Sequence, residues 1–334
     1  MQFEFSEALM AWYFIVILFI FSCIILSWLS SRLIRSLVQI AQYLNWKEFI
    51  IAFFVVAFAS SLPNLLVDLN AVFSGIPQLA FGDVLGGNLI DLTLVMAIAI
   101  FFSKKSISTE SEIVQKSAVF TSVVALLPLL LILDGKLDRI DGIILILSFA
   151  FYSWWLFSKK ERFGKVYDRS VKKPIEDFKG FLINVLKVII FLALLLLASE
   201  AVIISASFFS EKLGISIALV GILIVGLGNC FPELYFSIIS ARKEENWLVL
   251  GDLMGSVIIC ATLVLGIIAL VAPFEIKDFS PFLIARIFLV VGSIFALIFI
   301  KTGKKITKKE GLFLLFIYIV FLLIEIFTRS NKFF

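Results

Sequence analysis

Long apolar stretches, separated by short polar segments, divide the whole chain. The hydrocarbon core of a bilayer is about 30 Å thick and is crossed by about 20 apolar residues in a helix. Ten stretches approach or exceed that length: residues 9–42, 47–74, 78–102, 112–133, 139–157, 181–209, 216–242, 246–271, 281–300 and 310–327. The pattern predicts an all-α polytopic membrane protein with ten transmembrane helices.

Two of these regions also carry polar residues and helix breakers, and they repeat. VVAFASSLPNLLVDL at 55–69 precedes LAFGDVLGGNLIDLTLV at 79–95, and a second version follows 169 residues later at 225–237 and 248–264. Aligned without a gap, Pro63 falls on Pro232 and Asp83 falls on Asp252. Repeated polar interruptions in two halves of a membrane protein are typical of a transport site.

A charged linker at 158–179 separates two halves of five helices each. We expect an N-terminal half at 1–157, with its repeat at 47–102, and a C-terminal half at 180–334, with its repeat at 216–271. Because five is odd, the second half would enter the membrane in the opposite orientation. The sequence therefore predicts two inverted repeats, an arrangement suited to alternating access.

The two prolines predict discontinuous helices 2 and 7. Pro63 cannot donate a backbone hydrogen bond, so carbonyl groups near Ala59 and Ser60 need other partners. Lipid offers none, and irregular backbone at membrane depth is tolerated only inside protein or along a water-filled cavity. A simple proline kink would explain one copy, but two copies in register favour a functional interruption.

Lysine and arginine residues predict the orientation. With the N-terminus outside, the cytoplasmic connections carry 21 of them, and the outer connections with the C-terminal tail carry six. Basic residues concentrate in cytoplasmic loops. We expect an integral protein of the plasma (inner) membrane with both termini outside. The basic linker could touch anionic lipid headgroups, although a solvated loop is the simpler interpretation.

Composition narrows the chemistry. The chain is 61% hydrophobic, with a mean hydropathy of +1.10, and its three cysteines all lie in apolar runs. It has no histidine, which removes the commonest ligand of zinc sites and the usual proton relay near neutral pH. We expect no removable signal peptide, no cofactor, no ATP-driven pumping and no nucleic-acid partner. The sequence sets no oligomeric state, and a monomer is compatible with it.

Buried acids are functional candidates, because a charge at the bilayer centre costs about 2.5–3.5 kcal/mol. Residues four apart share a helix face. Four such faces supply oxygen donors: Asp83, Gly87 and Asp91; Asp252, Ser256 and Cys260; Asn64 and Asp68; Glu233 and Ser237. Ca²⁺ takes six to eight oxygen ligands, which these faces could provide. Asp83 and Asp252 have an alternative interpretation as helix caps.

These motifs resemble the cation/calcium exchanger superfamily, which includes the sodium–calcium exchangers. The family repeats read roughly Gly-Thr/Ser-Ser-x-Pro-Glu, then Gly-Asn-x-x-Gly-Ser-x-x-x-Asn/Asp. This chain has Ala-Ser-Ser-Leu-Pro-Asn at 59–64 and Gly-Asp-Val-Leu-Gly-Gly-Asn-Leu-Ile-Asp at 82–91. Its second copy has Gly-Asn-Cys-Phe-Pro-Glu at 228–233 and Gly-Asp-Leu-Met-Gly-Ser-Val-Ile-Ile-Cys at 251–260. The resemblance covers both repeats and the ten-helix plan.

The resemblance implies a secondary antiporter that exchanges Ca²⁺ for Na⁺, or for H⁺. It implies a cation-binding set of Ser60, Ser61, Asn64, Asp91, Glu233 and Ser256, with Asn64, Asp91 and Glu233 on the transported metal ion. A secondary or ion-pathway set comprises Asp68, Asp83, Asn229, Ser237, Asp252 and Cys260. Asn64 and Cys260 match the family in position only, because the family usually has Glu and Asp or Asn there.

Other functions stay open. The departures at Asn64 and Cys260 favour a different cargo on the same fold, either a monovalent cation with H⁺ or Mg²⁺. A non-transporting paralogue or sensor is a further alternative. An intramembrane aspartyl protease would use Asp83 and Asp252 as its dyad, but residues 249–252 read Val-Leu-Gly-Asp and no Pro-Ala-Leu follows. We therefore expect no enzyme. Glu200 is expected to be a buried acid that lines an ion path or pairs with a neighbour.

Overall fold

The computed structural model describes residues 2–44, 55–158 and 178–330, and helices dominate them. Within those ranges, nine helical stretches are long and apolar enough to cross a membrane: Trp12–Tyr43, Pro77–Phe102, Glu112–Asp134, Arg139–Ser158, Phe178–Leu213, Ile217–Arg242, Leu248–Val271, Ser280–Lys301 and Lys308–Thr328. The remaining predicted span, at 47–74, begins outside the described residues. Its described part comprises α3 (Val56–Ser60) and the apolar α4 (Leu62–Phe73).

Three of the spans are composite. The third joins α5 (Pro77–Ile90), a π-helical turn (Asp91–Val95) and α6 (Met96–Phe102). The seventh joins α10 (Ile217–Val220), a π-helical turn (Gly221–Val225), α11 (Gly226–Asn229) and α12 (Phe231–Arg242). The eighth joins α13 (Asn246–Ile258), a π-helical turn (Ile259–Val264) and α14 (Leu265–Val271). The other helices are α1 (Gln2–Tyr43), α7 (Glu112–Leu131), α8 (Arg139–Ser158), α9 (Phe178–Leu213), α15 (Leu283–Lys301) and α16 (Lys308–Ser330).

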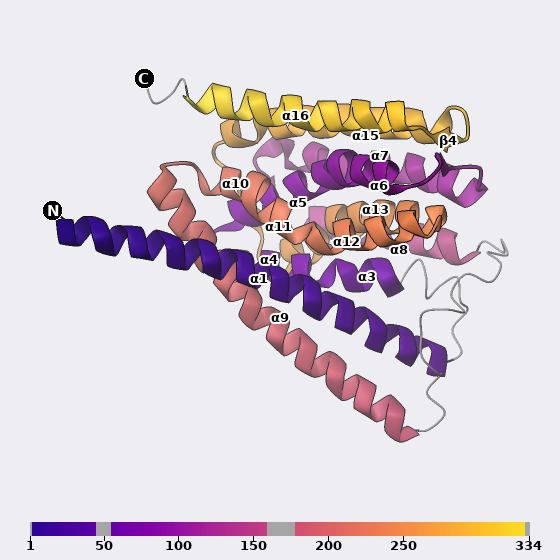
Figure 1. The fold of residues 1–334 in the computed structure, drawn as a ribbon, viewed down its shortest axis with the longest axis horizontal. Coiled ribbons are helices and arrows are strands. Elements are labelled where there is room, and N and C mark those ends of the chain that lie inside the picture. Colours follow the sequence, from indigo (N-terminus) through magenta and orange to yellow (C-terminus); the bar gives the residue numbers. More distant parts are fainter. Residues whose placement is uncertain (1, 45–54, 159–177, 331–334) are drawn as a thin grey trace.

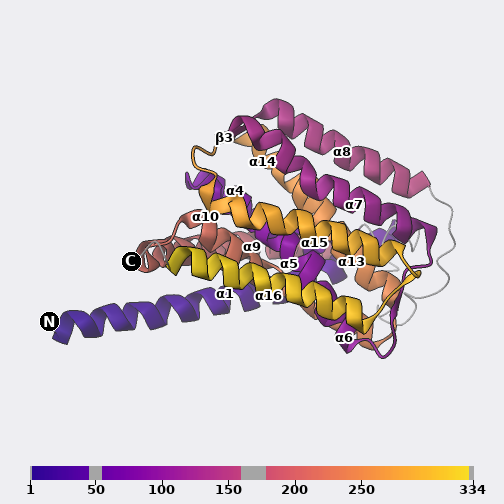
Figure 2. The ribbon, with the colours of Figure 1, turned by 90° about the horizontal axis from the view of Figure 1, so that it is seen from above.

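The two longest helices, α1 and α9, pack antiparallel beside the rest of the bundle (Figure 1). Trp12 near the start of α1 contacts Phe208 near the end of α9, with ring centroids 5.3 Å apart. At the other end, Tyr43 stacks on Phe181 at 4.9 Å. The start of α1 and the end of α16 lie toward the same end of the molecule (Figures 1 and 2).

The third and eighth spans form the core. In each, 78% of the most apolar window is buried inside the protein, against 11% in α9. Close packing of the backbones explains why the third span is buried at the centre of the bundle. A Cβ atom at Gly86 would lie 2.2 Å from the carbonyl oxygen of Ile222, so only glycine lets α5 approach the seventh span this closely. The two Gly-Asp segments of the sequence thus lie at the centre of the bundle.

The fold is all-α as predicted, except that two pairs of loops each form a short β-ladder. β1 (Ile107–Ser108) pairs antiparallel with β4 (Lys305–Ile306), and β2 (Lys136–Leu137) pairs with β3 (Phe274–Glu275). Because β3 precedes α15 and β4 follows it, the ladders lie at opposite ends of that helix. Each ladder joins a loop of the first half to a loop of the second.

Backbone features recur 169 positions apart, the spacing of the sequence repeat. α4 and α12 begin and end at this spacing. Left-handed turns follow it as well: Gly75 has φ 78° and Glu244 has φ 62°, while Gly135 has φ 91° and Lys304 has φ 52°. The similarity between the two segments therefore extends from residue types to backbone conformation.

Candidate functional site

Two helices are interrupted where the sequence predicts it. Ser61 separates α3 from α4 with φ −84° and ψ −5°, and Cys230 separates α11 from α12 with φ −80° and ψ 0°. Pro63 and Pro232 occupy the first turn of the helix that follows each interruption. A proline is tolerated there because the amide it lacks would have no partner within the helix.

The carbonyl group that Pro63 leaves without its helical donor has a partner inside the protein. Ser30 on α1 donates its hydroxyl to the carbonyl oxygen of Ala59 at 3.4 Å. The irregular backbone is therefore satisfied by a neighbouring helix, as membrane depth requires. The sequence pattern did not point to Ser30 as the donor of this contact.

Asp83 and Asp252 do not cap their helices, so that alternative interpretation is wrong. The caps are Ile76 and Glu245, and both acids lie more than one turn inside the helix, beyond reach of its free N–H groups. Each instead accepts a bond from the residue just before the interruption in the other half. Asn229 donates its amide to Asp83 Oδ2 at 2.6 Å, and the Ser60 hydroxyl donates to Asp252 Oδ1 at 3.3 Å.

Glu233 and Asp91 form the acidic centre of the site. Ser256 donates its hydroxyl to Glu233 Oε1 at 3.4 Å and is also within hydrogen-bonding reach of Asp91. The carboxylate of Glu233 interacts electrostatically with Asp91 and Asp252. Asp91 begins the first π-helical turn, a distortion frequently found at functional sites.

The pair that is equivalent by the repeat is neutral. Asn64 and Cys260 lie 169 positions from Glu233 and Asp91 respectively. The Asn64 side-chain amide donates to Cys260 Sγ at 3.5 Å. The structure thus brings together the predicted partners across the two repeats, with both formal charges on the side of Glu233 and Asp91.

Unpartnered oxygen atoms are concentrated at this site. All twelve predicted site residues are buried. Seven of them have buried side-chain oxygens without a hydrogen-bond partner: Asn64 Oδ1, Asp68 Oδ1 and Oδ2, Asp91 Oδ1, Asn229 Oδ1, Glu233 Oε2, Ser237 Oγ and Asp252 Oδ2. A buried polar atom left unpaired costs about 1–3 kcal/mol. Such a concentration is expected where a ligand completes the bonding.

The donor set is mixed. Within the described part of the chain, no three His, Cys, Asp or Glu side chains are close enough to hold a metal ion by themselves. A cation here would therefore also need amide, hydroxyl or backbone oxygens, such as those of Asn64, Ser60 and Ser256. Among the described residues, no lysine or arginine forms an ion pair with the acids of the site.

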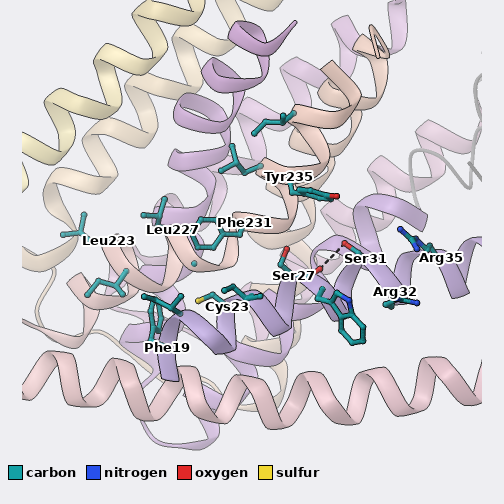
Figure 3. Close-up of a pocket in the computed structure, with 17 residues that line it drawn as sticks. Phe19, Cys23, Ser27, Ser31, Arg32, Arg35, Leu223, Leu227, Phe231 and Tyr235 are labelled. Carbon is teal, nitrogen blue, oxygen red and sulfur yellow. Dashed lines mark hydrogen bonds between the residues drawn. The ribbon is translucent and has the colours of Figure 1, made fainter. Parts of the chain in front are cut away.

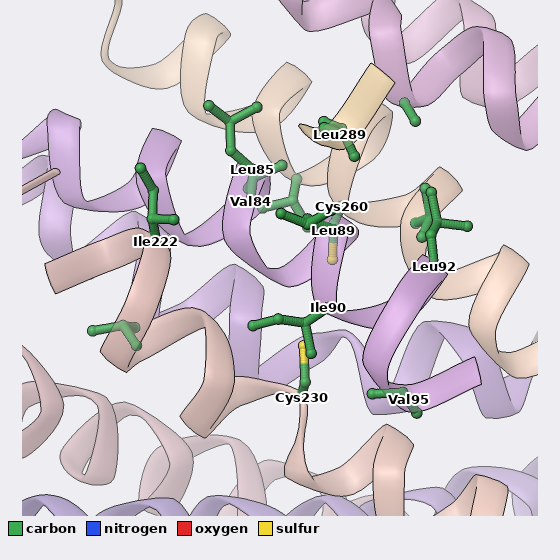
Figure 4. Packing of buried hydrophobic residues seen from close by; sticks show 14 of the residues in the cluster. Val84, Leu85, Leu89, Ile90, Leu92, Val95, Ile222, Cys230, Cys260 and Leu289 are labelled. Carbon is green, nitrogen blue, oxygen red and sulfur yellow. The ribbon is translucent and has the colours of Figure 1, made fainter. Parts of the chain in front are cut away.

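Apolar side chains enclose the polar cluster. Figure 4 shows Leu89, Ile90 and Val95 around the thiols of Cys230 and Cys260. Cys230 also points its thiol toward the carbonyl oxygen of Gly87, 3.6 Å away. A low-dielectric wall strengthens the attraction between a cation and the carboxylates inside it.

Glu200 is exposed on α9, and the expectation of a buried acid is therefore wrong. Asn70 on α4 donates its amide to Glu200 Oε2 at 3.0 Å, and to Ser199 Oγ at 3.3 Å. Glu200 was expected to be buried because it lies in an apolar run. However, α9 packs on the outside of the bundle, and Glu200 lies on an exposed face of α9. Glu325 on α16 is buried, and the sequence reasoning did not single it out.

A large groove lies apart from the polar site. A groove of about 970 Å³ lies between α1 and the seventh span, and none of the predicted site residues lines it. Figure 3 shows Phe19, Cys23 and Phe231 along the groove and Arg32 and Arg35 toward one end. Its apolar lining suits lipid better than a hydrated cation.

Comparison with known proteins gives consistent results. The family described as "Sodium/calcium exchanger protein" matches residues 14–158 and 183–327. The "Putative antiporter CaxA" of Alkalimonas amylolytica is 27% identical over 89% of this chain and 93% of its own length. "Inner membrane protein YrbG" of Escherichia coli (strain K12) is also 27% identical, over 88% and 91%. A structure of the sodium-calcium exchanger NCX_Mj, soaked with Na⁺ and Sr²⁺, covers 93% of this chain and 98% of its own, with a TM-score of 0.64 at 22% identity.

Proposed function

The chain belongs to the sodium/calcium exchanger protein family and is a membrane cation antiporter, and we propose that it exchanges Ca²⁺ for Na⁺ by alternating access. One observation supports Ca²⁺ as the transported ion. Glu233, Asp91 and Ser256 meet inside the bundle, where unpartnered oxygens of both halves also gather. Hard oxygen donors with two formal negative charges suit a hard divalent cation.

The proposed cation site comprises Ser60, Ser61, Asn64, Asp91, Glu233 and Ser256, with Asn64, Asp91 and Glu233 as the ligands of the transported metal. Ser61 lies at the interruption itself, and Asn64 follows one turn later with its Oδ1 unpartnered. Discontinuous helices with irregular backbone at the midplane are the usual framework of such sites in transporters. No cofactor is required, because the ions themselves are the substrates.

We further propose ten spans in two inverted five-helix repeats, comprising residues 1–157 and 180–334 with a linker at 158–179. The backbone recurrence at 169 positions supports this proposal, since helix limits and left-handed turns both follow it. The strand pairing supports the proposal too. β2 and β4 are 169 positions apart, and each pairs with a strand of the opposite half, β2 with β3 and β4 with β1. The start of α1 and the end of α16 lie toward one end of the molecule, as an even number of spans requires.

Both termini are proposed to lie outside the cell, on the basis of the basic residues in the loops. A plasma or inner membrane location is consistent with this orientation. The relative YrbG is described as an inner membrane protein. Inorganic cations and membrane lipid are the proposed partners.

One structural observation favours a different transported ion. The Asn64–Cys260 pair puts an amide and a thiol where a more acidic exchanger site would carry charge. Fewer charges and a softer atom favour a monovalent cation with H⁺, or another divalent ion such as Mg²⁺. A protein that no longer transports is the remaining alternative.

A flux assay separates these functions. Purified protein is reconstituted in liposomes loaded with Ca²⁺, and efflux is started by external Na⁺, by a pH step, or by choline as the inert control. Calcium–sodium exchange predicts efflux with Na⁺ alone. Efflux that follows the pH gradient equally well without Na⁺ would assign H⁺ as the counter-ion. The same assay with Mg²⁺ or K⁺ inside tests the other cargoes, and no flux of any ion would indicate a non-transporting protein.

A further inference from the structure

Asp68 on α4 is a fully buried carboxyl group that the proposed calcium site does not use. Its exposed fraction is 0%, and neither of its carboxyl oxygens receives a hydrogen bond from an amide or hydroxyl group. It interacts with another buried carboxyl group, Asp83 on α5, which is within hydrogen-bonding reach when one of the two is protonated. Two adjacent buried carboxylates repel each other, so the pair is stable only with a positive charge between or beside them.

Asn229 completes a three-sided cluster with these two acids. It is the last residue of α11, and its amide nitrogen lies 2.6 Å from Asp83 Oδ2. Its own side-chain oxygen is buried and unpartnered. Three unpartnered oxygens, two from Asp68 and one from Asn229, therefore belong to a cluster that already contains the Asp83 carboxylate. The cluster is built from three different helical segments, two from the first half and one from the second.

The second half has no equivalent of this cluster. Position 237, which is 169 residues after Asp68, holds a serine. The contact equivalent to Asn229–Asp83 is Ser60–Asp252, which contains a single acid. The additional negative charge at Asp68 is therefore specific to one side of the molecule. A merely structural polar contact would not need a second, unpaired carboxylate.

The size and charge of the cluster decide the ligand class. Ca²⁺ takes six to eight oxygens, and the three side chains supply too few. One positive charge would offset one of the two carboxylates, and the Asn229 amide already stabilises the other. The groups that face the cluster electrostatically from other elements are Cys23, Cys230, Cys260 and Asp91, none of which is a cation.

We propose that Asp68, Asp83 and Asn229 form a second cation site, which binds one monovalent cation, Na⁺ or a proton, apart from the divalent ion at Glu233. This inference rests on the proposed antiport, in which the counter-ion needs a separate binding site. Because Asn229 lies just before the interruption at Cys230, a cation at this cluster would act on the helix that carries Glu233.

Thermal unfolding of the purified protein tests the site. The midpoint Tm is measured at constant ionic strength, with NaCl replaced by choline chloride, at pH 6 and pH 8, and separately with CaCl₂. The variants are Asp68→Asn, which keeps the shape, and Asp68→Ser, which reproduces the residue at the equivalent position 237. Ser205→Ala, at a buried serine on α9 outside the site, is the matched control, and Glu233→Gln removes the divalent site. A ligand that binds only the folded state raises Tm with its concentration.

We expect the wild-type Tm to rise with Na⁺, or with the lower pH, and both Asp68 variants to lose that rise while keeping the rise with Ca²⁺. Glu233→Gln should show the opposite loss, and Ser205→Ala should behave as wild type. A sodium response assigns Na⁺ to the cluster, and a pH response assigns a proton. Asp68 variants that respond like wild type to both, or a wild type that responds to neither, would overturn the proposal. A missing calcium response in wild type would instead count against the proposed function.

Discussion

Asn229 and Asp83 are 146 positions apart in the chain, and their side chains are 2.6 Å apart in the bundle. Ser60 and Asp252 make the equivalent contact in the other direction, across 192 positions. Each interrupted helix is thus tied, just before its interruption, to the central helix of the opposite half. A movement that separates an interruption from the opposite central helix must expose a buried carboxylate.

Charge at the centre of the site should be essential. Glu233→Gln and Asp91→Asn each remove one of the two formal charges that face the proposed divalent ion. Loss of one partner from a buried ionic contact costs about 3–5 kcal/mol, so calcium flux in liposomes should fall roughly a hundredfold or more. Near-normal flux in Glu233→Gln, at matched protein levels, would disprove the proposed site for any ion.

The neutral pair should be more tolerant than the charged pair. Cys260→Ser keeps a hydrogen-bonding group close to Asn64 and should change calcium flux only slightly, because a thiol is a weak ligand for a hard cation. Asn64→Ala removes one uncharged oxygen ligand and should raise the calcium concentration for half-maximal flux. If Cys260→Ser were as damaging as Glu233→Gln, the division of charge between the two pairs would be wrong.

Two adjacent glycines should respond differently to the same change. A Cβ at Gly86 would lie 2.2 Å from a backbone oxygen of Ile222, whereas at Gly87 the nearest atom is Cys230 Sγ at 3.7 Å. Overpacking costs about 1–3 kcal/mol or more, so Gly86→Ala should lower Tm strongly and Gly87→Ala should hardly change it. Equal effects on Tm would mean that α5 and the seventh span are not in such close contact.

The orientation can be tested at two equivalent loop positions. Lys136 in β2 and Lys305 in β4 are 169 residues apart, and the inverted arrangement puts them on opposite sides of the membrane. The three native cysteines are buried. A membrane-impermeant maleimide applied to intact cells should label Lys136→Cys and leave Lys305→Cys unmodified until the cells are opened. Labelling of both from outside would contradict the inverted repeat.

Glycine in place of Lys304 should stabilise the left-handed turn at that position. A non-glycine residue in this conformation costs about 1–2 kcal/mol, partly offset by the greater freedom of glycine in the unfolded chain. Lys304→Gly, with φ 52° at present, should therefore raise the free energy of unfolding by up to about 1 kcal/mol. Lys305→Gly is the control, because its residue belongs to β4 and should lose stability instead.

Apolar length and the two prolines were sufficient to predict the helical architecture and the interruptions, since membrane depth leaves few other solutions. The twelve candidate residues stood out because polar and ionisable groups in apolar runs are conspicuous and because they match the family motifs, and their role in transport stays a prediction. What could not be predicted was which groups meet. Asp83 was open to interpretation as a cap because its bond to Asn229 links two halves of the chain, and Glu200 was misplaced because hydropathy does not tell an outward face from an inward one.

The turns at Glu244 and Lys304 also bear on how the chain arose. Glycine occupies the equivalent positions in the first half, Gly75 and Gly135, and the backbone keeps the same left-handed conformation in the second half without it. A conformation that persists where its favoured residue is gone is what an ancient tandem duplication leaves after its two copies diverge. The two halves now differ at the proposed site, with Asn64 and Asp68 in one and Glu233 and Ser237 in the other. One chain thus contains two unlike copies, as an oligomer of diverged duplicated subunits does.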